Sequence, residues 1–133
     1  MCYSHLIKAM EETYMGNAIT PEQYHECYEL AKKVNAGSVS IKEATSWLSD
    51  IGVSENSAMM YLRCARGMLE GKRFTSRVKE NAISYNLTQI YAEFHAEGLE
   101  RALKSLRQYL DYQKKYTNYP GLEKVYTDFK EIL

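Results

Sequence analysis

The stretch "IGVSENSAMMYLRCARGMLEGKRF", residues 51–74, contains the pattern that decides how this chain folds. It opens on a glycine-valine-serine turn and closes on a glycine that is followed by two basic residues and an aromatic one. Between the two glycines, apolar side chains recur at the three- and four-residue spacing of a helix with one buried face. Two helices that meet at a glycine turn can cross steeply, as in a helix-turn-helix. The sequence therefore predicts a helix-turn-helix-like pair over about 41–51 and 55–70.

Start and stop signals on either side of that stretch predict a helical bundle. In "TPEQ" and "SIKE", Thr20 and Ser40 can cap a helix while a Gln or Glu three residues later reaches back, which is the capping-box pattern. Glycines stand where helices are expected to stop, and "TNYPG" is typical of a turn. We expect one all-α domain over 1–133: a single compact bundle of about six helices, with a weakly amphipathic segment over about 2–15 before them.

The apolar spacing also predicts finer features. The helix that begins after Ser40 should bury Ile41, Ala44, Trp47, Leu48 and Ile51. A later helix should begin after a cap at Thr75 or Ser76, and Gly98 should separate it from the following helix. A short terminal helix over 122–133 should dock through Val125, Phe129 and Ile132.

The composition is that of an ordinary globular protein, with 45% hydrophobic and 26% charged residues and no net charge. No apolar run approaches the roughly 18 residues of a membrane span. The N-terminus turns acidic too soon for a signal peptide. An odd set of widely spaced cysteines (Cys2, Cys27 and Cys64) indicates free thiols in a reducing compartment. We therefore expect a cytoplasmic protein that contacts no membrane.

The neutral total hides an uneven distribution of charge. Residues 61–79 carry six basic side chains and one acidic one, a local charge of +5, whereas residues 1–30 carry one lysine and five glutamates, a local charge of −4. Basic residues in a loop beside a helix start can hold phosphate groups. The phosphate-holding residues that we expect are Arg63, Arg66, Lys72, Arg73 and Arg77.

The start of the predicted 55–70 helix would then face a DNA groove. In a helix-turn-helix protein the first residues of the second helix contact base edges. Here those residues include Ser54, Asn56 and Ser57, and an asparagine can form a bidentate pair with adenine. The glycine spacing alone equally suits a plain αα-hairpin, so the basic cluster is what favours DNA binding.

Several motifs together resemble a known family. "SVSIKEA" follows Gly37, "GVSENSA" precedes Tyr61, "MLEGKRF" precedes a helix, and "GLERAL" leads to Tyr109 and Tyr112. Over about 24–112 this order resembles the helical N-terminal module of McrA-like, HNH-type, modification-dependent restriction endonucleases. The resemblance implies a module that helps to engage DNA, plain or modified, beside a nuclease domain of a parent protein. It does not imply cleavage by this chain, whose histidines are isolated.

Enzyme chemistry finds no support in the sequence pattern. His25 and Cys27 are two residues apart, so on a helix their side chains point about 200° apart and cannot share a metal ion. No glycine-rich phosphate loop and no nucleophile elbow is present. We expect no catalytic residue, metal site or cofactor in this chain alone.

A second function class stays open at this stage. A protein-protein interaction, oligomerisation or inhibitor module with no nucleic-acid binding would expose an apolar or aromatic patch. The terminal segment over 116–133 is the best candidate for such a patch, because a short amphipathic helix can dock on a partner. The same segment could instead close the core of its own domain.

Overall fold

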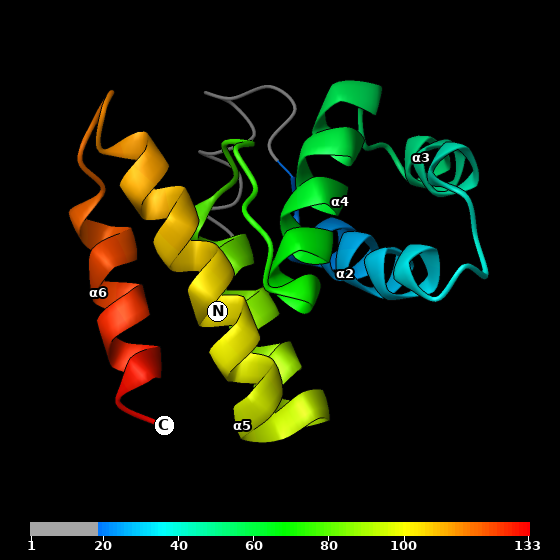
Figure 1. Cartoon of the computed structure of the whole chain (residues 1–133). Coiled ribbons are helices and arrows are strands. Elements are labelled where there is room, and N and C mark those ends of the chain that lie inside the picture. The colour runs from blue at the N-terminus through cyan, green and yellow to red at the C-terminus, as the bar shows by residue number, and fades with distance from the viewer. Residues whose placement is uncertain (1–18) are drawn as a thin grey trace, which may run out of the picture.

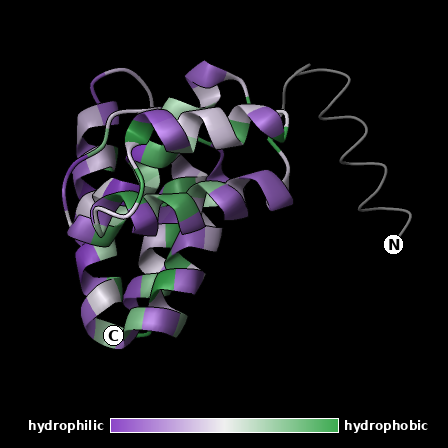
Figure 2. Cartoon of the chain, turned by 90° about the vertical axis from the view of Figure 1, so that its right-hand side faces the viewer, coloured by the Kyte–Doolittle hydropathy of each residue, from purple (hydrophilic) through white to green (hydrophobic). Residues whose placement is uncertain are grey.

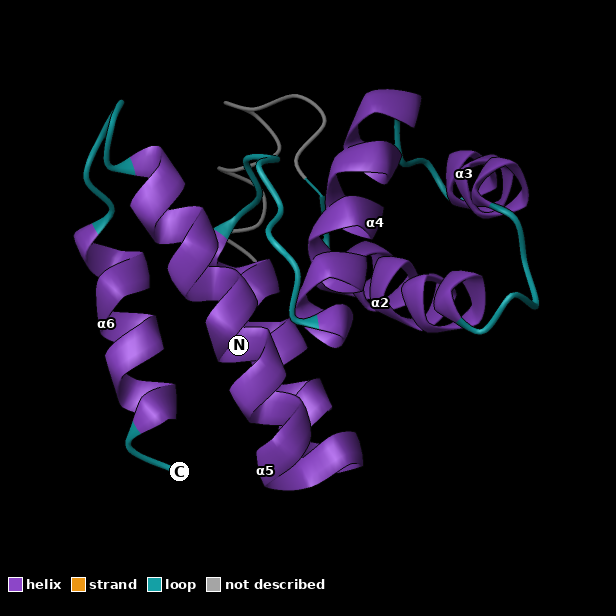
Figure 3. Cartoon of the chain, in the orientation of Figure 1, coloured by secondary structure: helices purple, strands orange, loops and turns teal. Residues whose placement is uncertain are grey.

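The computed structural model describes residues 19–133, and within this range all regular structure is helical (Figures 1 and 3). Five helices follow one another: α2 (Pro21–Asn35), α3 (Ile41–Asp50), α4 (Glu55–Glu70), α5 (Glu80–Gln113) and α6 (Pro120–Lys130). The predicted all-α class is confirmed. The segment expected over 2–15 lies outside the described residues.

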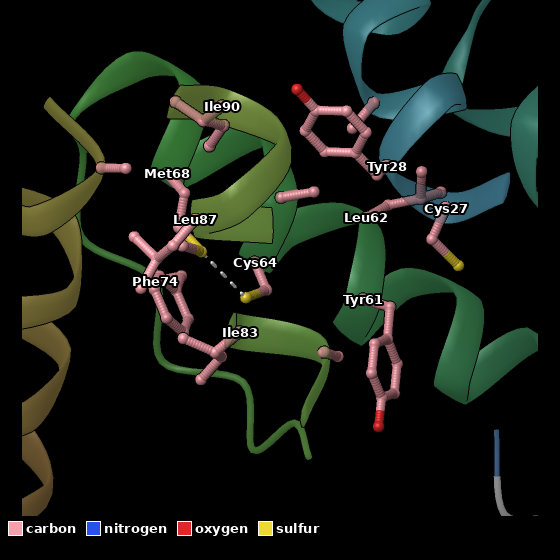
Figure 4. Packing of buried hydrophobic residues seen from close by; sticks show 14 of the residues in the cluster. Cys27, Tyr28, Tyr61, Leu62, Cys64, Met68, Phe74, Ile83, Leu87 and Ile90 are labelled. Carbon is pink, nitrogen blue, oxygen red and sulfur yellow. Dashed lines mark hydrogen bonds between the residues drawn. The ribbon is translucent and has the colours of Figure 1, made fainter. Parts of the chain in front are cut away.

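Helix α4 is the centre of the fold. It packs against α2, α3 and α5, while α6 packs against α5 (Figure 1). Its buried side chains meet those of the neighbouring helices in one core, where Leu62 lies near Tyr28 and Met68 lies near Leu87 (Figure 4). Apolar segments face inward between the helices and polar segments face outward (Figure 2). The amphipathic spacing of the sequence is thus satisfied by burial on one face of each helix.

The start signals of α2 and α3 and the stop signal of α3 act as the sequence predicts. Thr20 and Ser40 each accept a hydrogen bond from the backbone N–H three residues on, and each capping box is completed by Gln23 or Glu43. At the end of α3, Gly52 has a φ of 92°, which glycine adopts at little cost. Its N–H donates to Ser49 and the next N–H donates to Leu48, so the helix ends in a Schellman motif.

The described residues form five helices rather than six, because the two helices expected over this part of the chain are joined across a kink as the two limbs of α5. A straight helix of its 34 residues would be about 51 Å long, whereas a globular chain of this size has a radius of gyration of about 14 Å. Instead α5 folds back at its lower end in Figure 1, and the break lies at His95 (φ 57°, ψ −151°) rather than at Gly98. Gly98 is helical and buried. A Cβ at this position would lie 2.3 Å from the Cβ of Phe94, so the close packing requires glycine.

The predicted cap at Thr75 or Ser76 is wrong, because α5 begins only after Lys79 and lacks a side-chain cap. The preceding loop is held by tertiary contacts. Phe74 is buried and stacks on Tyr109, with ring centroids 4.4 Å apart. The Tyr61 hydroxyl accepts a hydrogen bond from the Lys79 N–H at 3.1 Å. The buried Phe74 side chain holds this segment as a loop against Tyr109 of α5. The helix therefore begins at Glu80 and not directly after residue 75 or 76.

The apolar stripes of the two short helices are only partly buried. In α3, Ala44 and Leu48 are buried, but Ile41, Trp47 and Ile51 are exposed, contrary to expectation. In α6, Leu122 is buried and Val125 and Phe129 pack against the core, whereas Ile132 lies beyond the helix and is exposed. Helix α3 contacts only α2 and α4, so its outer face has no neighbour among the described residues.

Candidate nucleic-acid interface

The predicted groove-facing residues lie at the start of α4 and do not share one face. The Ser54 hydroxyl caps the helix by accepting a hydrogen bond from the Ser57 N–H at 3.2 Å. Asn56 is exposed, whereas Ser57 is half-buried and lines a hollow of about 460 Å³ between α4, the loop before α5 and the start of α6. Ser54 is exposed as well, but its hydroxyl oxygen is engaged in the cap.

Four of the five predicted phosphate-holding residues surround one hollow. This basic hollow has a volume of about 530 Å³ and lies where α4 passes into the following loop. Glu70 is its only acidic lining residue, and two hydroxyl side chains join its wall. The side chains that line it with Glu70 are Arg63, Arg66, Lys72, Arg73, Phe74, Thr75 and Ser76.

Each cation of the basic hollow is held differently. The Arg66 Nε donates to the Asn35 side-chain oxygen at 2.8 Å, which ties the end of α4 to the end of α2. The Lys72 Nζ lies 3.0 Å from a Glu70 carboxylate oxygen, but its side chain is 75% exposed. Exposed ion pairs of this kind contribute little to stability. Arg63 is exposed, so it and Lys72 can turn toward an anion at little cost.

Arg77 does not join this group. Its Nε donates to the Tyr119 hydroxyl at 2.9 Å, its Nη2 donates to the same oxygen, and it lines the other hollow together with Ser57. The hydrogen bond to Tyr119 raises the pKa of Arg77 above its usual value. Charge spacing in the sequence could not separate Arg77 from its neighbours, because Tyr119 lies 42 residues further along the chain.

The fold adds an aromatic pair that the charge pattern did not include. The Arg73 guanidinium lies over the Tyr112 ring, 5.2 Å from its centroid, and the Tyr116 ring lies 5.7 Å from that of Tyr112. Tyr116 is 71% exposed, and Lys114 and Lys115 beside it are exposed as well. A signal was present in "YLDYQKKY", where tyrosines recur at helical spacing and two lysines precede the last of them.

Helices α3 and α4 are joined by a short turn that contains Gly52. In Figure 1, α3 is seen almost along its axis while α4 runs down the view, so the two cross steeply. Helix α4 is covered by α2, α3 and α5 along much of its length. Its outward face is narrow, and it includes Asn56, Arg63 and Glu70.

Two other structural features are absent from the described residues, a metal site and a membrane-spanning helix. Among residues 19–133, no group of His, Cys, Asp and Glu side chains is placed to hold a metal ion. No helix in the same range is long and apolar enough to cross a bilayer.

No family model matches the chain, and no curated protein or solved structure matches it either.

Proposed function

We propose that this protein binds DNA through the end of α4 and the loop that follows it. The observation that carries the proposal is the basic hollow, where Arg63, Arg66, Lys72 and Arg73 surround a solvent-open depression with a single carboxylate. Such a cluster is complementary in charge to a phosphate backbone, which supplies much of the affinity of DNA-binding proteins. Thr75 and Ser76 add hydroxyl donors at the same wall.

The exposed face of α4 extends this surface toward the helix start. Asn56 and Arg63 are seven residues apart, so they lie on the same face and about 10 Å apart along the axis. In this proposal Arg63 holds a phosphate while Asn56 contacts a base edge, as in a helix-turn-helix. Ser54 keeps its hydroxyl hydrogen available while it caps α4, because a hydroxyl can accept and donate at once. Ser57 takes no part.

The resemblance to the head module of modification-dependent restriction endonucleases supports the same proposal and suggests methylated DNA as a ligand to test. The resemblance rests on "SVSIKEA", "GVSENSA" and "MLEGKRF". The last two of these motifs overlap the two ends of α4, which bears the proposed surface.

Fluorescence anisotropy with labelled duplexes tests the proposal. We expect salt-sensitive binding by the parent protein, and we expect Arg73→Glu to weaken it at least tenfold and to flatten its salt dependence. Lys42→Glu is the matched control, because Lys42 is an exposed cation on α3, away from the hollow, and its reversal changes the total charge equally. Plain and cytosine-methylated duplexes of one sequence test the restriction link. Equal weakening by both variants would contradict a localised site.

One observation favours the alternative of a protein-interaction module. Trp47 is 60% exposed and Ile51 is 40% exposed, and both line a hollow between α3 and the start of α2. Exposed large apolar side chains that gather on one element are typical of interaction surfaces. If the parent protein fails to bind any duplex at low salt while remaining folded, this alternative replaces DNA binding.

A further inference from the structure

We propose that the ligand of this interface includes an unpaired strand of nucleic acid, in which a base stacks on the exposed Tyr116 ring, beside the Arg73–Tyr112 pair, while the phosphates lie in the basic hollow. The inference rests on the proposed DNA binding and names the strand class that the surface accepts. It adds a second recognition element, supplied by the end of α5, to the cations of α4 and its loop.

The first support is that the hollow and the tyrosines form one continuous surface. Arg73 belongs to both, because it lines the basic hollow and lies over the Tyr112 ring at 5.2 Å. Tyr116 continues the row at 5.7 Å from Tyr112. A strand held at the hollow can therefore pass directly onto an aromatic face.

The second support is the graded burial of three tyrosines at helical spacing. Tyr109 is buried and stacked on Phe74, Tyr112 is half-buried, and Tyr116 is 71% exposed. Tyr109 fixes this part of α5 in the core, and the following turn presents Tyr116 to solvent. Tyr116 stands just beyond α5, where its N–H and that of Thr117 both donate to the Gln113 carbonyl at 2.9 Å. The backbone beneath the exposed ring is thus hydrogen-bonded in place.

The third support is the charge around the rings. Lys114 and Lys115 are exposed and precede Tyr116 in the turn after α5, and the Arg73 guanidinium lies over the Tyr112 ring. The nearest acid on this helix, Asp111, is paired with Arg107 at 3.0 Å. The bases of a single strand are planar and are joined by anionic phosphates, so they are complementary to aromatic rings beside cations. Proteins bind single strands through these two kinds of contact. A double helix keeps its bases stacked inside, so it could use the cations but not the rings.

The test compares three labelled probes by anisotropy: a twelve-nucleotide thymidine strand, an abasic strand of the same length and a blunt twelve-base-pair duplex. The parent protein should bind the thymidine strand about tenfold or more tighter than the abasic strand, because both carry the same phosphates and only one can stack. Tyr116→Ala should remove that difference and leave duplex binding unchanged. Tyr116→Trp should preserve it.

Matched controls separate stacking from other effects. Tyr91→Ala removes another exposed tyrosine of α5, outside the row, and should leave all three affinities unchanged. Arg73→Glu should weaken every probe. Duplex binding without a preference for thymidine over abasic strand, or with Tyr116→Ala behaving as the parent, overturns this inference and leaves the proposed function standing. Failure of all three probes to bind overturns both.

Discussion

His95 holds a backbone conformation that suits glycine better than any other residue. Its φ of 57° and ψ of −151° lie far from helical values, yet α5 continues on both sides. Non-glycine residues held in such regions cost of the order of 1–3 kcal/mol. The strain persists because the turn lets α5 fold back and bury apolar side chains on both of its limbs, including Leu87 and Leu103.

His95→Gly should therefore stabilise the protein. We expect the free energy of unfolding to rise by about 1 kcal/mol, since relief of strain outweighs the added freedom of glycine in the unfolded chain. Glu97→Gly is the control, because that exposed residue is helical and its replacement should cost about 1 kcal/mol. Urea denaturation of the two variants measures both changes. A loss of stability in His95→Gly would show that the histidine side chain, and not the backbone, supports the turn.

At the scale of elements, α6 is attached to α5 by one well-formed ion pair. The two terminal nitrogens of Arg107 each donate to a different Glu123 oxygen at 2.9 Å, and the guanidinium also lies 4.9 Å from the centre of the Tyr126 ring. Leu122 is the only fully buried residue of α6. The pair should therefore matter more for this helix than an isolated surface contact would.

Glu123→Gln should destabilise the protein by about 1 kcal/mol, because a bidentate arginine pair is stronger than an exposed one. The hydrogen bond from Arg107 lowers the pKa of Glu123, so the stabilisation is present above the unfolded-state pKa and is lost as pH falls through the lower folded-state value. The difference between parent and variant should shrink as the solution is acidified below pH 4.5, the ordinary pKa of a glutamate. Asp128→Asn, which breaks the exposed pair with Lys124, should change stability little at any pH. A pH-independent effect of Glu123→Gln would contradict the role of charge.

The same scale shows which elements could be predicted from the sequence. Helices that begin with Thr20 and Ser40 were predictable because their signals lie within four residues of one another. The start of α5 was not, because Phe74 must reach Tyr109, which lies 35 residues further along the chain. The break at His95 carries no glycine signal, so pattern reasoning placed it at Gly98. Close packing against Phe94, and not a turn, requires that glycine.

At the scale of the whole molecule, some residues of the candidate site could be predicted from the sequence and others could not. Arg63, Arg66, Lys72 and Arg73 were predictable as a group because a helix and its following loop keep them close. Arg77 was misplaced because Tyr119 draws it toward α6. The tyrosines at 112 and 116 were missed because only the fold brings the end of α5 beside the loop after α4. Local sequence thus identified the cations, and tertiary packing decided which of them share a surface.

The reactivity of the two buried thiols reports whether α2 and α4 unfold together. Cys27 on α2 and Cys64 on α4 are both buried. Burial raises the pKa of Cys27 from its ordinary 9.0 to about 12 and raises that of Cys64 as well. Both thiols therefore stay protonated and inaccessible in the folded protein at pH 8. Alkylation by iodoacetamide, followed by mass spectrometry of the separate peptides, should be slowed at both sites on the order of 1000-fold or more relative to the protein in guanidinium.

Stability should also fall in alkaline solution. An unfolded thiol loses its proton near pH 9 while the folded one keeps it, so the unfolded state binds fewer protons between about pH 9 and the raised pKa of Cys27, about 12. The free energy of unfolding must then decrease as pH rises through this window. Replacing both buried cysteines by alanine should flatten that decrease, even though the cavities lower stability at every pH.

In the alkylation experiment, equal protection of Cys27 and Cys64 would show that α2 and α4 open together, whereas faster labelling of Cys27 would show that α2 detaches first.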